Sequence, residues 1–159
     1  MSFIQRTGLV LLLLLACPGG ARAGDISAFL ATAAPSATWG RGYGGTFSTS
    51  WFGVVNLEGE AAQQAGEEAD SGMASFTASA LIAPPVGFLV PYGGVGVGLF
   101  RQTLGKRSDF GTLKALVLGV KVKIGPVLVL KGEYRSYDLS GEPLLALDHR
   151  FSAGAGITF

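Results

Sequence analysis

The sequence has little charge and no long apolar run. Asp, Glu, Lys and Arg make up 14% of its 159 residues, against about 25% in an ordinary soluble domain. The mean hydropathy of +0.43 is instead typical of a membrane protein. Yet the longest unbroken apolar run covers only residues 9–17, whereas a membrane-spanning helix needs about 20 residues. The sequence therefore excludes a helical membrane protein and argues against an ordinary soluble domain.

Cysteine and histidine are also nearly absent. Cys17 is the only cysteine, and it lies in the N-terminal segment that is interpreted below as a cleaved signal peptide. A mature chain without it can form no disulfide and no Cys-ligated metal site. His149 is the only histidine, and Ser152, three residues later, would lie on the opposite face of a strand. A direct His–Ser catalytic pair is therefore not expected, and we predict no catalytic residue, cofactor or metal. Because acidic and basic residues nearly balance, we expect no nucleic-acid partner either.

The N-terminal segment has the features of a secretory signal peptide. A start with one Arg and no acid precedes a Leu-rich run, which ends in the A-x-A sequence Ala21-Arg22-Ala23. We therefore predict a signal peptide over residues 1–23 and a single mature domain over residues 24–159. An alternative is a lipoprotein cleavage box at residues 14–17, which would leave a lipidated Cys17.

Alternation of apolar and polar residues predicts eight strands. It is clearest in residues 150–159, where odd positions are apolar and even positions are polar or Gly. Six further runs lie near residues 43–51, 55–60, 74–82, 91–99, 116–124 and 128–135. The first strand, about residues 25–33, keeps no single parity.

Turn-forming residues separate these runs. They predict longer connections at residues 34–41, 65–71, 105–110 and 138–147, and shorter ones at 52–54, 83–87 and 124–126. An odd connection at residues 124–126 keeps both faces of its hairpin consistent. It would pair Lys123 with Val127, Lys121 with Val129 and Gly119 with Lys131.

The polar face consists mainly of Gly, Ser and Thr, which suits the narrow interior of an eight-stranded barrel better than a surface in water. We therefore expect the apolar face to meet lipid and seven charged side chains to pair inside the lumen. The seven are Glu58, Glu60, Lys121, Lys123, Lys131, Glu133 and Arg135. Aromatic residues near strand ends are expected to form girdles at the membrane interfaces. They are Trp39, Tyr43, Trp51, Phe52, Phe88, Phe100, Phe110, Tyr137, Phe151 and Phe159.

Three segments carry a resemblance to a known family: PYGGVGVG at residues 91–98, GEYRSYDL at 132–139 and FSAGAGITF at 151–159. The chain resembles the small eight-stranded outer-membrane barrels, such as the transmembrane domain of OmpA, OmpX and the opacity-type adhesins. The resemblance implies an all-β fold, an eight-stranded antiparallel up-and-down transmembrane β-barrel in the outer membrane of a Gram-negative bacterium. It also implies periplasmic termini and four longer connections outside the cell.

The same resemblance implies partners and a role. The partners would be outer-membrane lipid, lipopolysaccharide, periplasmic chaperones and the outer-membrane assembly machinery. The C-terminal residues resemble the signal that this machinery reads, here Phe151, Ala153, Ala155, Ile157 and Phe159. We expect a monomeric, non-enzymatic barrel with a plugged lumen and a role in envelope structure or surface contact. The alternatives are a lipid-modifying barrel enzyme and a soluble or lipidated periplasmic barrel that binds an apolar ligand.

Overall fold

The computed structural model describes residues 21–34, 38–51, 53–141 and 143–159. Nearly all of the predicted signal peptide and the whole of the alternative lipoprotein box lie outside these residues. In the described part of the chain, no helix is long and apolar enough to cross a membrane.

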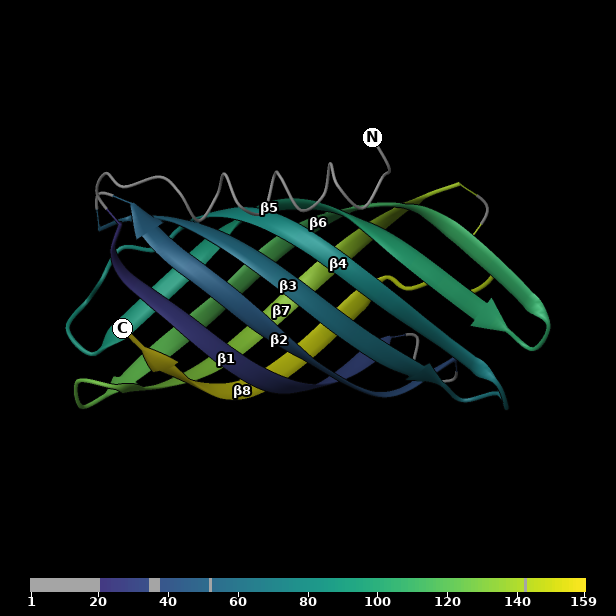
Figure 1. The fold of residues 1–159 in the computed structure, drawn as a ribbon, viewed down its shortest axis with the longest axis horizontal. Helices are drawn as coiled ribbons and strands as arrows, with labels where there is room; N and C mark the ends of the chain where they lie inside the picture. The colour runs from purple at the N-terminus through teal and green to yellow at the C-terminus, as the bar shows by residue number, and fades with distance from the viewer. Residues whose placement is uncertain (1–20, 35–37, 52, 142) are drawn as a thin grey trace, which may run out of the picture.

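Eight antiparallel strands form a closed barrel in which each strand pairs with its neighbours in sequence and the first pairs with the last (Figure 1). The strands are β1 (Ala21–Ala34), β2 (Trp39–Trp51), β3 (Val55–Gly66), β4 (Ser71–Ile82), β5 (Leu89–Leu104), β6 (Arg107–Ile124), β7 (Leu128–Ser140) and β8 (His149–Thr158). The predicted eight-stranded up-and-down barrel is confirmed. Below, the mouth is the end that carries the β1–β2, β3–β4, β5–β6 and β7–β8 connections, and the opposite end is the termini end.

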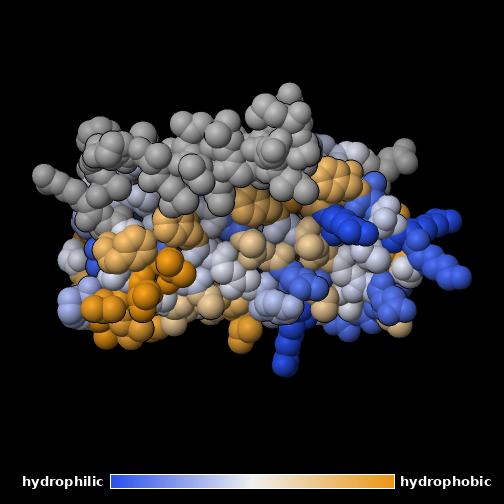
Figure 2. Space-filling model, in the orientation of Figure 1, coloured by the Kyte–Doolittle hydropathy of each residue, from blue (hydrophilic) through white to orange (hydrophobic). Residues whose placement is uncertain are grey.

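The two faces of the strands differ as their alternation predicts. In β4, Phe76 is 51% exposed on the outer face while the next residue, Thr77, is fully buried inside. The irregular parity of β1 has a simple cause: Ile26 and Leu30 point outward, whereas Phe29 points inward and is buried. Figure 2 shows hydrophobic residues over much of the visible face and hydrophilic residues gathered towards the mouth.

The connection predicted over residues 105–110 is wrong. Leu104 pairs with Arg107, so only Gly105 and Lys106 form the turn. Gly105 has φ 58°, and a glycine with positive φ at the first turn position suits a two-residue hairpin. The polar residues that follow belong to β6, which begins at Arg107. These first residues of β6 pair with β5 alone, because the pairing of β6 with β7 begins only at Thr112.

The β6–β7 register also differs from the prediction. The connection is odd, as expected, but it covers residues 125–127, because Ile124 pairs with Leu128. Lys121 therefore faces Lys131 and not Val129. Gly125, with φ 67°, supplies the left-handed conformation that starts this turn. A shift of two residues leaves every side chain on its expected face.

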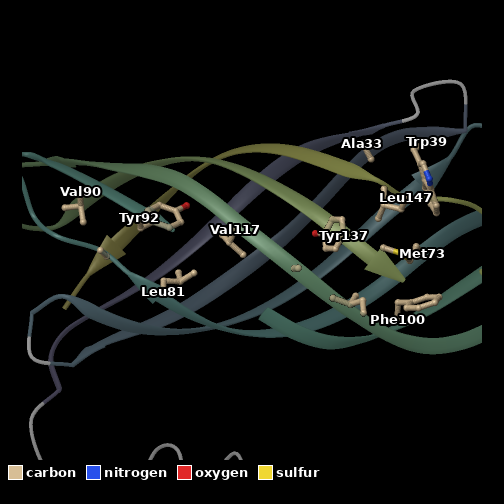
Figure 3. Close-up of a cluster of buried hydrophobic side chains, with 13 residues drawn as sticks. Ala33, Trp39, Met73, Leu81, Val90, Tyr92, Phe100, Val117, Tyr137 and Leu147 are labelled. Atoms are coloured by element: carbon tan, nitrogen blue, oxygen red, sulfur yellow. The ribbon is translucent and has the colours of Figure 1, made fainter. Parts of the chain in front are cut away.

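The interior contains apolar clusters near both ends (Figure 3). Three of the residues expected in the aromatic girdles, Trp39, Phe100 and Tyr137, are instead buried inside the barrel. Parity explains this error, because these three side chains lie on the inner face of their strands. Five expected girdle residues are exposed: Tyr43, Phe88, Phe110, Phe151 and Phe159. Trp51 is half-buried, and Phe52 lies outside the described residues.

Candidate functional site: a charged cluster inside the barrel

Eight charged side chains are buried inside the barrel together with these apolar residues. Four are acidic and four are basic, so their formal charges cancel. They come from five strands: Asp25, Glu58, Glu60, Lys121, Lys131, Glu133, Arg135 and Arg150. Each occupies an inward-facing position of its strand, and burial of so many charges is tolerated only when they are paired.

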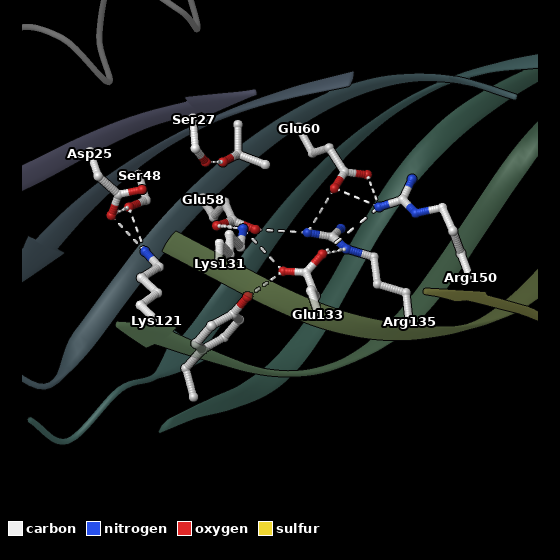
Figure 4. A network of polar contacts seen from close by, with 12 residues as sticks. Asp25, Ser27, Ser48, Glu58, Glu60, Lys121, Lys131, Glu133, Arg135 and Arg150 are labelled. Atoms are coloured by element: carbon white, nitrogen blue, oxygen red, sulfur yellow. Dashed lines mark hydrogen bonds and ion pairs between the residues drawn. The ribbon is translucent and has the colours of Figure 1, made fainter. Parts of the chain in front are cut away.

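Arg135 on β7 lies at the centre of the larger group (Figure 4). It is fully buried and contacts three carboxylates. Its Nη2 lies 2.7 Å from Glu58 Oε1 and 3.1 Å from Glu60 Oε2, and its Nε lies 2.6 Å from Glu133 Oε1. These contacts join β7 to β3 on the opposite wall of the barrel.

Two further cations complete this group. Lys131 Nζ lies 2.7 Å from Glu58 Oε2 and 3.0 Å from Glu133 Oε2. Arg150 Nη2 lies 2.7 Å from both carboxylate oxygens of Glu60. Each carboxylate in the group therefore accepts a hydrogen bond from at least one cation, which offsets part of the desolvation cost.

The smaller group joins β1, β2 and β6. Lys121 Nζ lies 2.6 Å from Asp25 Oδ2, and Ser48 donates to the same oxygen at 2.6 Å. Tyr92 lies between the two groups, with its ring centroid 5.6 Å from Lys121 Nζ and 5.4 Å from Lys131 Nζ. Its hydroxyl donates to Glu133 Oε2 at 2.8 Å. The aromatic ring thus connects both groups through cation–π contacts.

The structure brings six of the seven predicted lumen charges together but not Lys123, which is exposed. Lys123 is the second-to-last residue of β6, so it lies at the termini end of the barrel. Sequence reasoning missed Asp25 and Arg150. Asp25 lies on the strand with unclear parity, whereas Arg150 has the polar parity of the last strand and could have been recognised.

The contacts of the cluster tie opposite walls of the barrel together. Every one of its charged groups has an oppositely charged partner. In the described ranges, no group of three or more His, Cys, Asp or Glu side chains could hold a metal ion.

His149 lies at the start of β8 on the outer face, where its Nδ1 is 2.8 Å from the Tyr134 hydroxyl. Tyr134 also packs against Phe151, with ring centroids 5.0 Å apart. Ser152 lies on the inner face, so the strand separates the two side chains as the spacing predicts. The five residues of the predicted assembly signal are all exposed on the outer face of the last segment.

The comparisons identify the class of protein. A family model described as the outer membrane protein beta-barrel domain matches residues 12–159, and the chain belongs to this family. It is therefore a β-barrel protein of the Gram-negative outer membrane. A comparison with curated proteins gives no match.

Solved structures of small barrels share the fold. Neisserial surface protein A is 18% identical, with a TM-score of 0.60, over 86% of this chain and 97% of that chain. The N-terminal barrel domain of Pseudomonas aeruginosa OprF is 18% identical, with a TM-score of 0.62, over 88% of this chain and 99% of that chain. The outer membrane enzyme PagL is 18% identical, with a TM-score of 0.54, over 85% and 98%. The fold is therefore shared with at least one protein described as an enzyme.

Proposed function

We propose that the chain is a non-enzymatic outer-membrane barrel with a plugged lumen and a role in envelope structure or surface contact. The observation that carries this proposal is the balanced set of eight buried charges, six of which were expected from the sequence. An eight-stranded barrel has an interior just wide enough to be filled by side chains. Paired charges in that interior leave few polar groups free to bind a passing solute.

Conductance measurements in planar lipid bilayers test the plug. The purified protein is expected to give no single-channel steps, while a porin inserted in the same way gives them. Regular steps from the wild-type chain would contradict a plugged lumen. Heat-modifiable migration on gels would show that the inserted protein is the folded barrel.

The lipid-modifying enzyme remains the alternative. The opposite orientation of His149 and Ser152 supports the non-enzymatic proposal, because a nucleophile and its base must come within hydrogen-bond reach. Overexpression is expected to leave the lipid A and phospholipid profiles unchanged. A new lipid species that disappears with His149→Ala would favour the enzyme.

The proposal includes an orientation, with both termini in the periplasm and the mouth outside the cell. A Cys17→Ser background allows single cysteines to report it. An impermeant maleimide added to intact cells is expected to label Ala146→Cys at the mouth but not Val86→Cys at the termini end, both being exposed positions. The reverse pattern would overturn the orientation. Recovery of the protein from the soluble periplasm would favour the ligand-binding alternative.

The outer face and the C-terminal segment would account for the proposed partners. Large apolar side chains such as Leu30, which is 74% exposed, would contact lipid and the acyl chains of lipopolysaccharide. The outward-facing residues from Phe151 to Phe159 would be read by the assembly machinery after delivery by periplasmic chaperones. We propose a monomer, because the closed barrel has no unpaired seam between β1 and β8.

A further inference from the structure

The connection between β7 and β8 folds over the mouth and into it. Within it, residues 143–147 have the sequence Pro-Leu-Leu-Ala-Leu and belong to no strand. Leu147 is 2% exposed and joins the apolar cluster at the mouth, together with Trp39 and Met73. Figure 3 places these three labelled side chains close together at the mouth.

Side chains from two distant strands hold this segment by its backbone. Gln102 on β5 makes two hydrogen bonds to Leu145: its Nε2 donates to the carbonyl at 2.7 Å, and its Oε1 accepts from the N–H at 3.0 Å. Trp39 on β2 donates from Nε1 to the carbonyl of Ala146 at 2.6 Å. Gln102 is fully buried, so its amide has no water to bond to while the segment is in place.

The ends of the segment differ. After it, the backbone continues into paired structure, because Asp148 N donates to Ala34 O at 3.1 Å and Tyr137 N donates to Asp148 O at 2.9 Å. Before it, Gly141 has φ 108°, a conformation that only glycine adopts without strain. This glycine gives the chain a place to bend near the start of the segment.

We propose that residues 143–147 form a releasable lid over the buried apolar side chains at the mouth of the barrel, among them Trp39 and Met73. The lid contains no charged side chain, so neutral hydrogen bonds and the burial of Leu147 hold it closed. Such bonds contribute modestly, whereas the wall is held by continuous strand ladders. The lid therefore opens without breaking any strand pair and exposes Trp39 and Met73 to water. This inference goes beyond the proposed function, since it holds for a structural barrel and for an enzyme.

Cysteine accessibility tests the lid. Met73→Cys in a Cys17→Ser background places one thiol under the lid, beside Gln102, whose Nε2 lies 3.7 Å from the Met73 sulfur. The rate of reaction with a small impermeant methanethiosulfonate is measured in outer membranes opened by freeze–thaw. Adding Gln102→Ala removes both bonds to Leu145 and is expected to raise this rate about tenfold.

Gln64→Ala is the matched control. Gln64 is also a buried glutamine near the mouth, but its amide donates to the Gly40 carbonyl and not to the lid. It is expected to leave the labelling rate unchanged. Equal acceleration by both variants would show general loosening of the mouth and would overturn the proposal.

Trp39→Phe provides a second route to the same result. It keeps an aromatic ring in the apolar cluster but removes the donor to Ala146, and it is expected to raise the rate severalfold. This variant carries the test if Gln102→Ala fails to fold. The proposal is overturned if the thiol already reacts at the rate of an exposed cysteine in the parent background. It is equally overturned if no folded lid variant changes the rate.

Discussion

Arg135 is fully buried and contacts Glu58, Glu60 and Glu133. Replacing it with Met keeps much of the side-chain volume and removes the charge, which leaves three carboxylates to be balanced by Lys131 and Arg150. We expect Arg135→Met to lower the free energy of unfolding by about 3–5 kcal/mol, the range typical of breaking a buried ion pair. Urea unfolding of the barrel in detergent micelles, followed by its gel shift, measures this loss.

Arg101→Met is the matched control for that experiment. Arg101 is an exposed residue on the outer face of β5, so the same substitution is expected to change the unfolding midpoint little. Equal midpoints for Arg135→Met and the wild type would show that the cluster does not depend on its central cation.

At the scale of single residues, the sequence predicts which face of the strand a side chain occupies but not how far along the barrel it lies. Parity correctly places Glu58 and Arg135 inside, because both belong to regular strands. The same parity predicts Lys123 inside, although the end of β6 exposes it. Arg150 has the inner parity too, and its partner Glu60 is 90 residues away in sequence, which no local pattern reveals.

Strand register depends on packing that the apolar pattern does not contain. Shifting the β6–β7 pairing by two residues keeps every side chain on the same face, so the alternation fits both the predicted and the observed register. The observed one places Gly119 opposite Glu133, which accepts the hydrogen bond of Tyr92. The space beside Gly119 is occupied by the Tyr92 ring.

Gly119→Ala tests this packing. A Cβ at position 119 would collide with the Tyr92 ring and lie 2.8 Å from the Gly132 carbonyl oxygen. We expect a loss of about 1–3 kcal/mol in the free energy of unfolding, the usual cost of overpacking. In Gly132→Ala, the matched control on β7, the new Cβ meets nothing within 4 Å. It is expected to be neutral or slightly stabilising in the same urea titration, and an equal loss in both variants would contradict the role of Tyr92.

At the scale of the whole molecule, the barrel closes where β1 meets β8. Gly24 N donates to Phe159 O at 2.9 Å, and Phe159 N donates to Gly24 O at 3.0 Å. The alternation predicts this closed architecture, because eight two-faced strands in lipid leave no edge unpaired only when the sheet closes. The alternation does not predict the lid, since the lid depends on bonds between Gln102 on β5 and Leu145 on the β7–β8 connection, which are 43 residues apart in the sequence.

Phe159 lies where β1 meets β8, and its contribution to stability can be tested separately from its proposed role in assembly. Phe159 is 63% exposed, and its ring centroid lies 6.2 Å from that of Phe47, itself an outward-facing residue. Because the ring buries little surface, we expect Phe159→Ala to leave the urea midpoint of the refolded barrel nearly unchanged. If the assembly machinery reads this side chain, the same variant should give less folded protein in outer membranes, measured by the heat-modifiable fraction in cells. Phe110→Ala, another exposed phenylalanine, is expected to assemble normally. A loss of folding in micelles as large as that in cells would instead assign Phe159 to stability, because micelles contain no assembly machinery.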